Sequence, residues 1–115
     1  MIGSFQAMSL DPKILSAIED LAYERPTPVQ TQAIPLLLER RDVIGQAKTG
    51  TGKTAAFAIP LLQSFDKRIR GVQGLIITPT RELAIQVAKV VRELARYMRV
   101  RVLTIYGGQS YGKQI

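Results

Sequence analysis

The chain of 115 residues carries 16 lysines and arginines against 9 acidic residues, a formal net charge of +7, and contains no Cys or His. Its length suits one small domain or a piece of a larger one, and its 46% apolar residues suffice for a core. The lack of Cys and His excludes disulfides, thiol nucleophiles, His-based triads and most zinc sites. No apolar run approaches the ~20 residues of a membrane span, and residues 1–10 lack a secretory signal pattern. We expect a soluble, cytoplasmic protein with no membrane partner.

The positive charge is concentrated in the second half of the chain. Residues 1–58 contain six basic and six acidic residues, whereas residues 59–115 contain ten basic and three acidic ones, which accounts for the whole excess of 10 − 3 = 7. A basic surface of this kind suits a polyanionic partner, because fixed positive charge attracts phosphates and releases counterions. From charge alone, a solvated helix face explains the pattern equally well.

Two helices are expected before residue 40. Apolar residues recur at helical spacing over 10–21, with Ser9 or Asp11 as the N-cap and a proline in the first turn. A second helix begins at Thr27, where Gln30 can complete a capping box. Pro35 should bend or break this helix before residues 36–38.

From residue 42 onward, short apolar segments alternate with helical patterns. Strands are expected over 42–47, 74–78 and 100–106, separated by an apolar helix after residue 53 and by a helix from Thr80 with a stripe of apolar residues. A basic turn is expected at 68–73. This order predicts an α/β domain with a mostly parallel sheet and flanking helices.

The segment over 47–54 is typical of a phosphate-binding loop between a strand and a helix. Its glycines let backbone N–H groups converge on an anion, Lys53 can reach the β- and γ-phosphates, and the Thr54 hydroxyl can bind Mg²⁺. The general pattern begins with Gly, whereas this chain has Ala47. A plain turn is the alternative interpretation. The predicted phosphate-binding residues are Lys48, Thr49, Gly50, Thr51, Gly52, Lys53, Thr54 and Ala55.

Together with its neighbours, this loop resembles the amino-terminal part of a DEAD-box ATP-dependent RNA helicase. The chain contains four of that family's signatures in order: a Q motif at 22–30 with Phe5, the P-loop at 47–54, motif Ia at 79–84, and a Gly-Gly pair at 107–108. The resemblance implies that residues 1–115 are the first half of the first RecA-like P-loop domain, truncated before the DEAD box. ATP, ADP, Mg²⁺ and RNA are the ligands that it implies.

The resemblance also assigns roles to individual residues. Gln30 would bond the adenine edge and Phe5 would stack on the base, while Arg25 and Thr27 would support the pocket. Lys53 and Thr54 would act in catalysis, with Thr54 as a metal ligand. Taken without the family, a capping box is a competing explanation for Gln30, and a place in the core is the better explanation for Phe5. The family usually has Gly where this chain has Ala22.

RNA contacts are implied at two of the signatures. Motif Ia and the glycine pair would hold the RNA backbone without reading bases, so sequence-independent binding is expected. The residues alone are also compatible with an ordinary N-cap, a surface charge and a plain turn. The RNA-binding residues implied are Pro79, Thr80, Arg81, Gly107 and Gly108.

No apolar strand ending in paired carboxylates follows the phosphate loop, so we expect the chain alone not to hydrolyse ATP or unwind RNA. The strand from Val43 would also lack its usual sheet neighbours, and open sheet edges would favour self-association. Two alternatives remain: a non-catalytic P-loop module that binds nucleotide, or a basic domain whose loop grips RNA phosphates in place of ATP.

Overall fold

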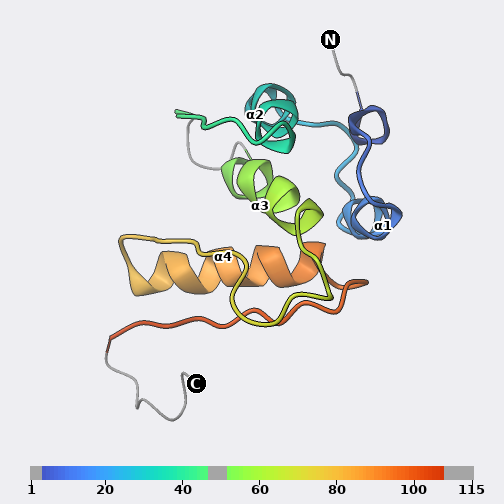
Figure 1. The fold of residues 1–115 in the computed structure, drawn as a ribbon. Coiled ribbons are helices and arrows are strands. Elements are labelled where there is room, and N and C mark those ends of the chain that lie inside the picture. Colours follow the sequence, from blue (N-terminus) through green and yellow to red (C-terminus); the bar gives the residue numbers. More distant parts are fainter. Residues whose placement is uncertain (1–3, 47–51, 108–115) are drawn as a thin grey trace.

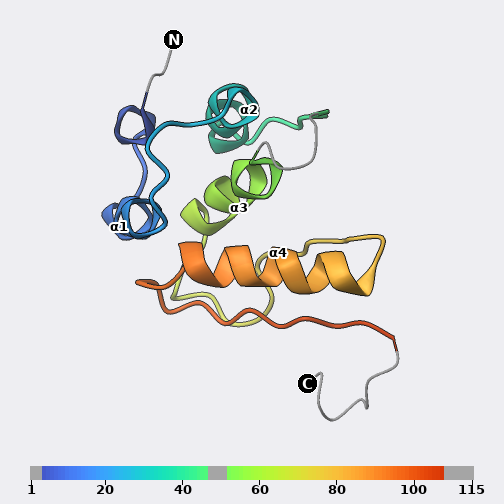
Figure 2. The same cartoon turned by 180° about the vertical axis from the view of Figure 1, so that it is seen from behind.

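The computed structural model describes residues 4–46 and 52–107. The other helices are arranged around a central one, α3 (Figure 1). Helix α3 contacts α1, α2 and α4, and it lies between α2 and α4. Seen from behind, the C-terminal extended segment runs along the side of α4 that faces away from α3 (Figure 2). No helix among the described residues is long and apolar enough to cross a membrane. The elements are η1 (Phe5–Met8), α1 (Pro12–Asp20), α2 (Pro28–Leu38), α3 (Lys53–Gln63) and α4 (Arg81–Leu94).

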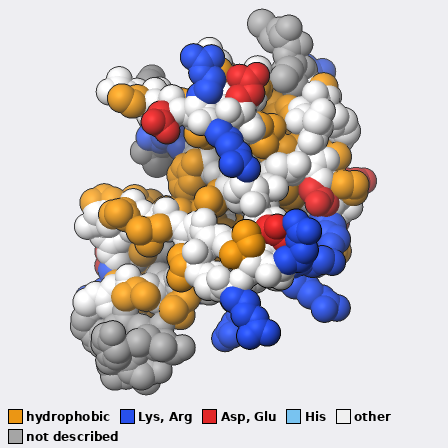
Figure 3. Space-filling model, viewed as in Figure 1, with side chains coloured by type: hydrophobic (Ala, Val, Ile, Leu, Met, Phe, Trp, Pro, Cys, Tyr) orange, Lys and Arg blue, Asp and Glu red, His pale blue; other side chains and the backbone are white. Residues whose placement is uncertain are grey.

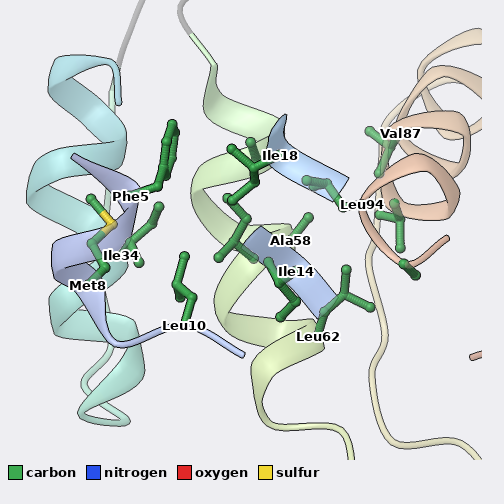
Figure 4. Packing of buried hydrophobic residues seen from close by; sticks show 14 residues of the cluster. Phe5, Met8, Leu10, Ile14, Ile18, Ile34, Ala58, Leu62, Val87 and Leu94 are labelled. Atoms are coloured by element: carbon green, nitrogen blue, oxygen red, sulfur yellow. The ribbon is translucent and has the colours of Figure 1, made fainter. Parts of the chain in front are cut away.

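One hydrophobic cluster joins all of these helices (Figure 4). Ile14 of α1, Ile34 of α2, Ile59 of α3 and Leu94 of α4 are fully buried within it. The apolar stripes predicted for these segments therefore face one shared core, and α3 is covered on several sides. Burial against α3 is what holds these short helices, since helices of this length are marginal alone.

Polar side chains fix where three helices begin. Asp11 caps α1 by accepting from the Lys13 N–H at 2.8 Å. Thr27 caps α2 in the capping box expected from the sequence, and Thr80 caps α4 by accepting from the Leu83 N–H at 3.1 Å. Each cap satisfies an N–H group that has no partner inside its helix.

Pro35 does not break α2, so a break at this residue was the wrong half of the prediction. The helix continues through the proline to Leu38. Ala33 and Ile34, which precede the proline, are buried against the core, at 6% and 0% exposure. Tertiary packing on both sides of the proline outweighs the hydrogen bond that its missing N–H forfeits.

Helices α1 and α2 both end in a Schellman motif without glycine. After α1, Tyr23 N–H donates to Ile18 C=O at 3.2 Å, and Ala22 has φ 59°. Arg40 takes the equivalent place after α2, with φ 63°. Glycine is the usual residue here, because it alone adopts the left-handed conformation without steric cost. The turn around Ala22 therefore forms, although it is strained.

The predicted α/β fold is contradicted, because the described residues contain helices and no strand. The segments 42–46, 74–78 and 100–106 are extended, but no backbone hydrogen bonds join them within the described part of the chain. A strand exists only through a neighbour that shares its hydrogen-bond ladder. Apolar sequence made these segments extended, but it could not supply that neighbour.

The last extended segment packs against α4 instead of against a sheet. Its alternate residues Val100 and Val102 lie against the core cluster, whereas Leu103 and Ile105 are 58% and 66% exposed. Arg92 of α4 donates to Val102 C=O at 3.1 Å and to Thr104 Oγ1 at 3.4 Å. The Arg92 side chain thus bonds a backbone carbonyl, that of Val102, which a neighbouring strand would otherwise bond.

The basic turn after α3 is organised by a side-chain amide. Gln73 accepts from the Asp66 N–H at 2.9 Å and donates to the C=O groups of Asp66 and Ile69, at 2.8 and 3.2 Å. The Arg68 guanidinium bonds the Asp66 carboxylate through both of its oxygens. These bonds close the turn expected at 68–73.

Candidate nucleotide and RNA site

A cleft of about 1740 Å³ is bordered by α2, α3 and α4. At one end it is lined by the loop before α2 and by the start of α3; at the other it is lined by residues 75–79 and by α4. Figure 3 shows hydrophobic side chains gathered on the left side of the molecule, with Lys and Arg at the lower right. The predicted binding residues that line the cleft are Arg25, Thr27, Gln30, Gly52, Lys53, Thr54, Ala55 and Pro79.

Gln30 is the only buried polar residue of the described part, at 3% exposure. Its Oε1 accepts from the Thr27 N–H at 2.9 Å, and its backbone N–H donates to Thr27 Oγ1 at 3.4 Å. Its Nε2 donates to Gly52 C=O at 3.2 Å. The capping box is therefore formed, and the same amide also reaches the start of α3.

Gly52 is shaped for this contact. It is the N-cap of α3 and has φ +84°. A Cβ at this position would lie 2.3 Å from Gln30 Nε2 and 3.0 Å from Thr27 Oγ1. Both the backbone conformation and the close approach therefore require glycine here.

Lys53 and Thr54 follow directly in the first turn of α3, with Lys53 exposed and Thr54 half-buried. A cation, a hydroxyl and the N–H groups of a helix N-terminus form a donor set that suits phosphate oxygens. Within the described residues no group of three acidic side chains could hold a metal ion. Ligation of Mg²⁺ by the Thr54 hydroxyl stays a prediction. Lys48, Thr49, Gly50 and Thr51 lie outside the described residues.

Phe5 lies in the core, at 1% exposure, and is not among the residues that line the cleft. Its ring centroid is 6.5 Å from that of Tyr23, which does line the cleft. Burial, and to a lesser degree the nearby Glu93 carboxylate, raise the pKa of Tyr23. Adenine stacking by Phe5 stays a prediction.

The residues predicted to touch RNA lie at the start of α4 and at the end of the last extended segment. Thr80 is the N-cap of α4, and its C=O accepts from the Thr78 hydroxyl at 3.2 Å. Arg81 is exposed, and its Cζ lies 5.4 Å from the centroid of the Tyr106 ring. Because Gly107 follows Tyr106, this contact brings the two signatures together. Gly108 lies outside the described residues.

Sequence reasoning missed several residues at these sites. Tyr23 lines the cleft, and its place inside the 22–30 signature was the signal that could have found it. Tyr106 contacts Arg81, and its only signal was that it precedes the glycine pair. Leu75, Ile77 and Leu83 also line the cleft; residues 74–78 were expected to lie in a sheet, and the described residues form none.

Comparison with known proteins identifies relatives across almost the whole chain. The family model for DEAD/DEAH box helicases matches residues 27–115. The DEAD-box ATP-dependent RNA helicase CshA of Bacillus cereus is 47% identical over 112 residues, which cover 97% of this chain and 21% of that protein. The ATP-dependent RNA helicase DeaD of Escherichia coli is 49% identical over 113 residues, covering 97% and 18%. The chain thus spans about a fifth of the length of these relatives.

Solved structures show the same similarity. A DEAD box protein from the hyperthermophile Methanococcus jannaschii matches with a TM-score of 0.92 and 40% identity, covering 98% of this chain and 31% of that one. The RNA-helicase Prp28 from Chaetomium thermophilum, solved bound to ADP, matches with a TM-score of 0.86 and 38% identity, covering 96% and 28%. The helical arrangement described above therefore follows that of these proteins closely.

Proposed function

Because the chain belongs to the DEAD/DEAH box helicase family, we propose that it is the nucleotide-binding part of an ATP-dependent RNA helicase. The observation that carries this proposal is the bond from Gln30 Nε2 to Gly52 C=O, at 3.2 Å. It joins the predicted adenine-binding segment to the predicted phosphate-binding segment within one cleft. Lys53 and Thr54 follow at the same end of that cleft.

Gln30 retains the capacity to bind adenine after these contacts. An amide has two N–H donors and two carbonyl lone pairs. One donor goes to Gly52 and one lone pair goes to the Thr27 N–H. One donor and one acceptor remain, which match the adjacent acceptor and donor of adenine, N7 and N6–H; guanine presents two acceptors, N7 and O6, on that same edge.

Phosphate binding falls to the start of α3. The Lys53 ammonium would neutralise the β- and γ-phosphates, and the Thr54 hydroxyl would ligate Mg²⁺, which draws charge from the phosphates during hydrolysis. We expect the chain alone not to hydrolyse ATP, since no apolar strand ending in paired carboxylates follows the phosphate loop in this sequence. The RNA backbone would be held by Thr80, Arg81 and Gly107. We propose that the helicase acts in the cytoplasm.

Calorimetric titration of the 115-residue chain with ADP·Mg²⁺ and GDP·Mg²⁺ tests the proposal. We expect ADP to bind more tightly than GDP, and Lys53→Ala to remove the binding of both. Lys67→Ala is the matched control, because it removes the same charge from the turn after α3, outside the cleft. Equal affinity for ADP and GDP, or unchanged binding by Lys53→Ala, would contradict the proposed site.

A second candidate is a nucleotide-binding module that catalyses nothing and self-associates. The exposed apolar side chains favour it, because Leu75 and Ile77 are 79% and 85% exposed on one extended segment. Sedimentation velocity over a range of concentrations distinguishes the candidates. Dimers that bind ADP and persist with saturating RNA would support the module; monomers throughout would exclude it.

A further inference from the structure

We propose that Tyr106 is a positioning residue for RNA binding, whose ring holds the Arg81 guanidinium at the start of α4. The Arg81 Cζ atom lies 5.4 Å from the ring centroid, within the range of a cation–π contact. The inference rests on the proposed RNA-binding role of Arg81. It gives a function to a residue that none of the four sequence signatures includes.

Both partners of this contact are anchored to α4. Arg81 is the first residue of the helix, whose N-cap Thr80 is fixed by its bond from the Leu83 N–H. Tyr106 is half-buried at the end of the extended segment, which Arg92 ties to α4 through Val102 C=O. The start of α4 and the end of the extended segment are therefore both held in place where they meet at Arg81. Without the Tyr106 ring, this exposed arginine would be free to change rotamer.

The contact leaves the guanidinium able to bind phosphate. A guanidinium stacks on an aromatic ring through its face, whereas its N–H donors point outward in its own plane. Those donors can still form paired bonds with two phosphate oxygens. Lysine could not form the same paired bonds, since its charge is a single point without a planar fork of donors. Contact with the Tyr106 ring thus orients the donors without using them.

Holding Arg81 in advance should strengthen binding. A long side chain loses rotamer freedom when it engages RNA, and a side chain that is already ordered loses less. The contact also places Gly107 next to the first turn of α4. The backbone at Gly107 and the donors of Arg81 can then meet one RNA strand together.

Fluorescence anisotropy with a labelled single-stranded oligouridine at low salt tests the inference. We expect Tyr106→Leu to weaken binding about fivefold, equivalent to about 1 kcal/mol. Tyr106→Phe keeps the ring and should bind like the unaltered chain. Ile105→Ala, a change to the exposed neighbour on the same segment, is the matched control and should also bind normally. In an Arg81→Ala background, Tyr106→Leu should cause no further loss.

Proton NMR of the unaltered chain provides a second readout that a merely structural role would not move. Ring current from Tyr106 should shift the Arg81 Hε and Hδ signals, and the shift should vanish in Tyr106→Leu. Unshifted Arg81 signals would overturn the inference even if Tyr106→Leu failed to fold.

The binding data distinguish a failure of the inference about Tyr106 from a failure of the proposed RNA-binding function. If the unaltered chain binds RNA but Tyr106→Leu binds equally well, the inference fails and the proposed function stands. If Tyr106→Phe loses as much affinity as Tyr106→Leu, the hydroxyl and not the ring is responsible, which also overturns it. If the unaltered chain does not bind RNA at low salt, the proposed RNA contact and this inference fail together.

Discussion

Gln30 and Gly52, 22 residues apart in the chain, are joined by a hydrogen bond from the side-chain amide of the first to the carbonyl of the second. The amide thereby ties the N-terminal turn of α2 to the N-terminal turn of α3. In a nucleotide complex these two turns would face the base and the phosphates. This side chain, together with the packing of α2 on α3, holds the two predicted recognition elements at a fixed spacing before any ligand arrives.

We expect Gly52→Ala to destabilise the chain and to weaken ADP binding. The positive φ costs about 1–2 kcal/mol for a residue with a Cβ. The clash of that Cβ with Gln30 Nε2, at 2.3 Å, adds about 1–3 kcal/mol of overpacking. Urea unfolding and calorimetric titration measure the two effects.

Gly71→Ala is the matched control for Gly52→Ala. Gly71 also has a positive φ, of +97°, but a Cβ there would meet nothing within 4 Å. It should show the backbone cost alone, with ADP binding unchanged. Equal losses of stability in the two variants would contradict the close contact between Gly52 and Gln30.

Replacing Ala22 by glycine should stabilise the protein by about 1 kcal/mol, since glycine adopts the left-handed conformation without the penalty that alanine meets. Ala22 holds φ 59° at the end of α1. The midpoint of urea unfolding should rise accordingly. Ala84→Gly makes the same chemical change inside α4 and should destabilise by about 0.5–1 kcal/mol. Changes of the same sign in both variants would refute this account of the turn.

Leu94→Ala should cost about 2–5 kcal/mol, the range for a large-to-small change at a well-packed site. Leu94 is fully buried at the end of α4. Leu103→Ala makes the same change at a side chain that is 58% exposed. We expect it to lower the free energy of unfolding by well under half of the loss in Leu94→Ala. Similar losses at both positions would mean that the extended segment is as tightly packed as the core.

The turn after α3 should respond to acid. Hydrogen bonds from the Arg68 side chain, and then from its backbone N–H, lower the pKa of Asp66 from 3.8 to about 2. A lowered folded-state pKa stabilises the protein above the unfolded value, and this contribution is lost as the pH falls from about 4 through about 2. Carbon-detected NMR titration measures the carboxyl directly. In Arg68→Ala its pKa should rise towards 3.8; an unchanged value would exclude Arg68 as the cause.

The helices of this fold were largely predictable, because their signals are local. Asp11, Thr27 and Thr80 were identifiable as N-caps, since a cap needs only a side-chain oxygen and an N–H two or three residues on. Helical spacing of apolar residues identified the faces that bury Ile14 and Leu94. Pro35 misled because its effect on a helix depends on what the helix packs against, and that information lies elsewhere in the chain.

Local sequence signals could not show whether the apolar segments pair into a sheet. Residues 74–78 and 100–106 have the apolar character of strands, but pairing depends on a partner and not on the segment itself. For the candidate site, the resemblance named Gln30, Lys53 and Thr54, and all three line one cleft; their roles stay predictions. It could not foresee that Phe5 lies away from that cleft, or that Tyr106 meets Arg81, because both facts depend on tertiary packing.

The exposed faces of the extended segments also govern how the protein behaves at high concentration. Leu75, Ile77 and Ile105 present apolar surface, while the net charge of +7 keeps molecules apart at neutral pH. Added salt screens that repulsion, and sulfate in particular strengthens apolar association. The same repulsion disappears as the pH approaches the isoelectric point near 10.2. Colloidal stability should therefore be greater in dilute chloride buffers near neutrality than in sulfate or near pH 10.2, and low salt also favours the proposed RNA binding.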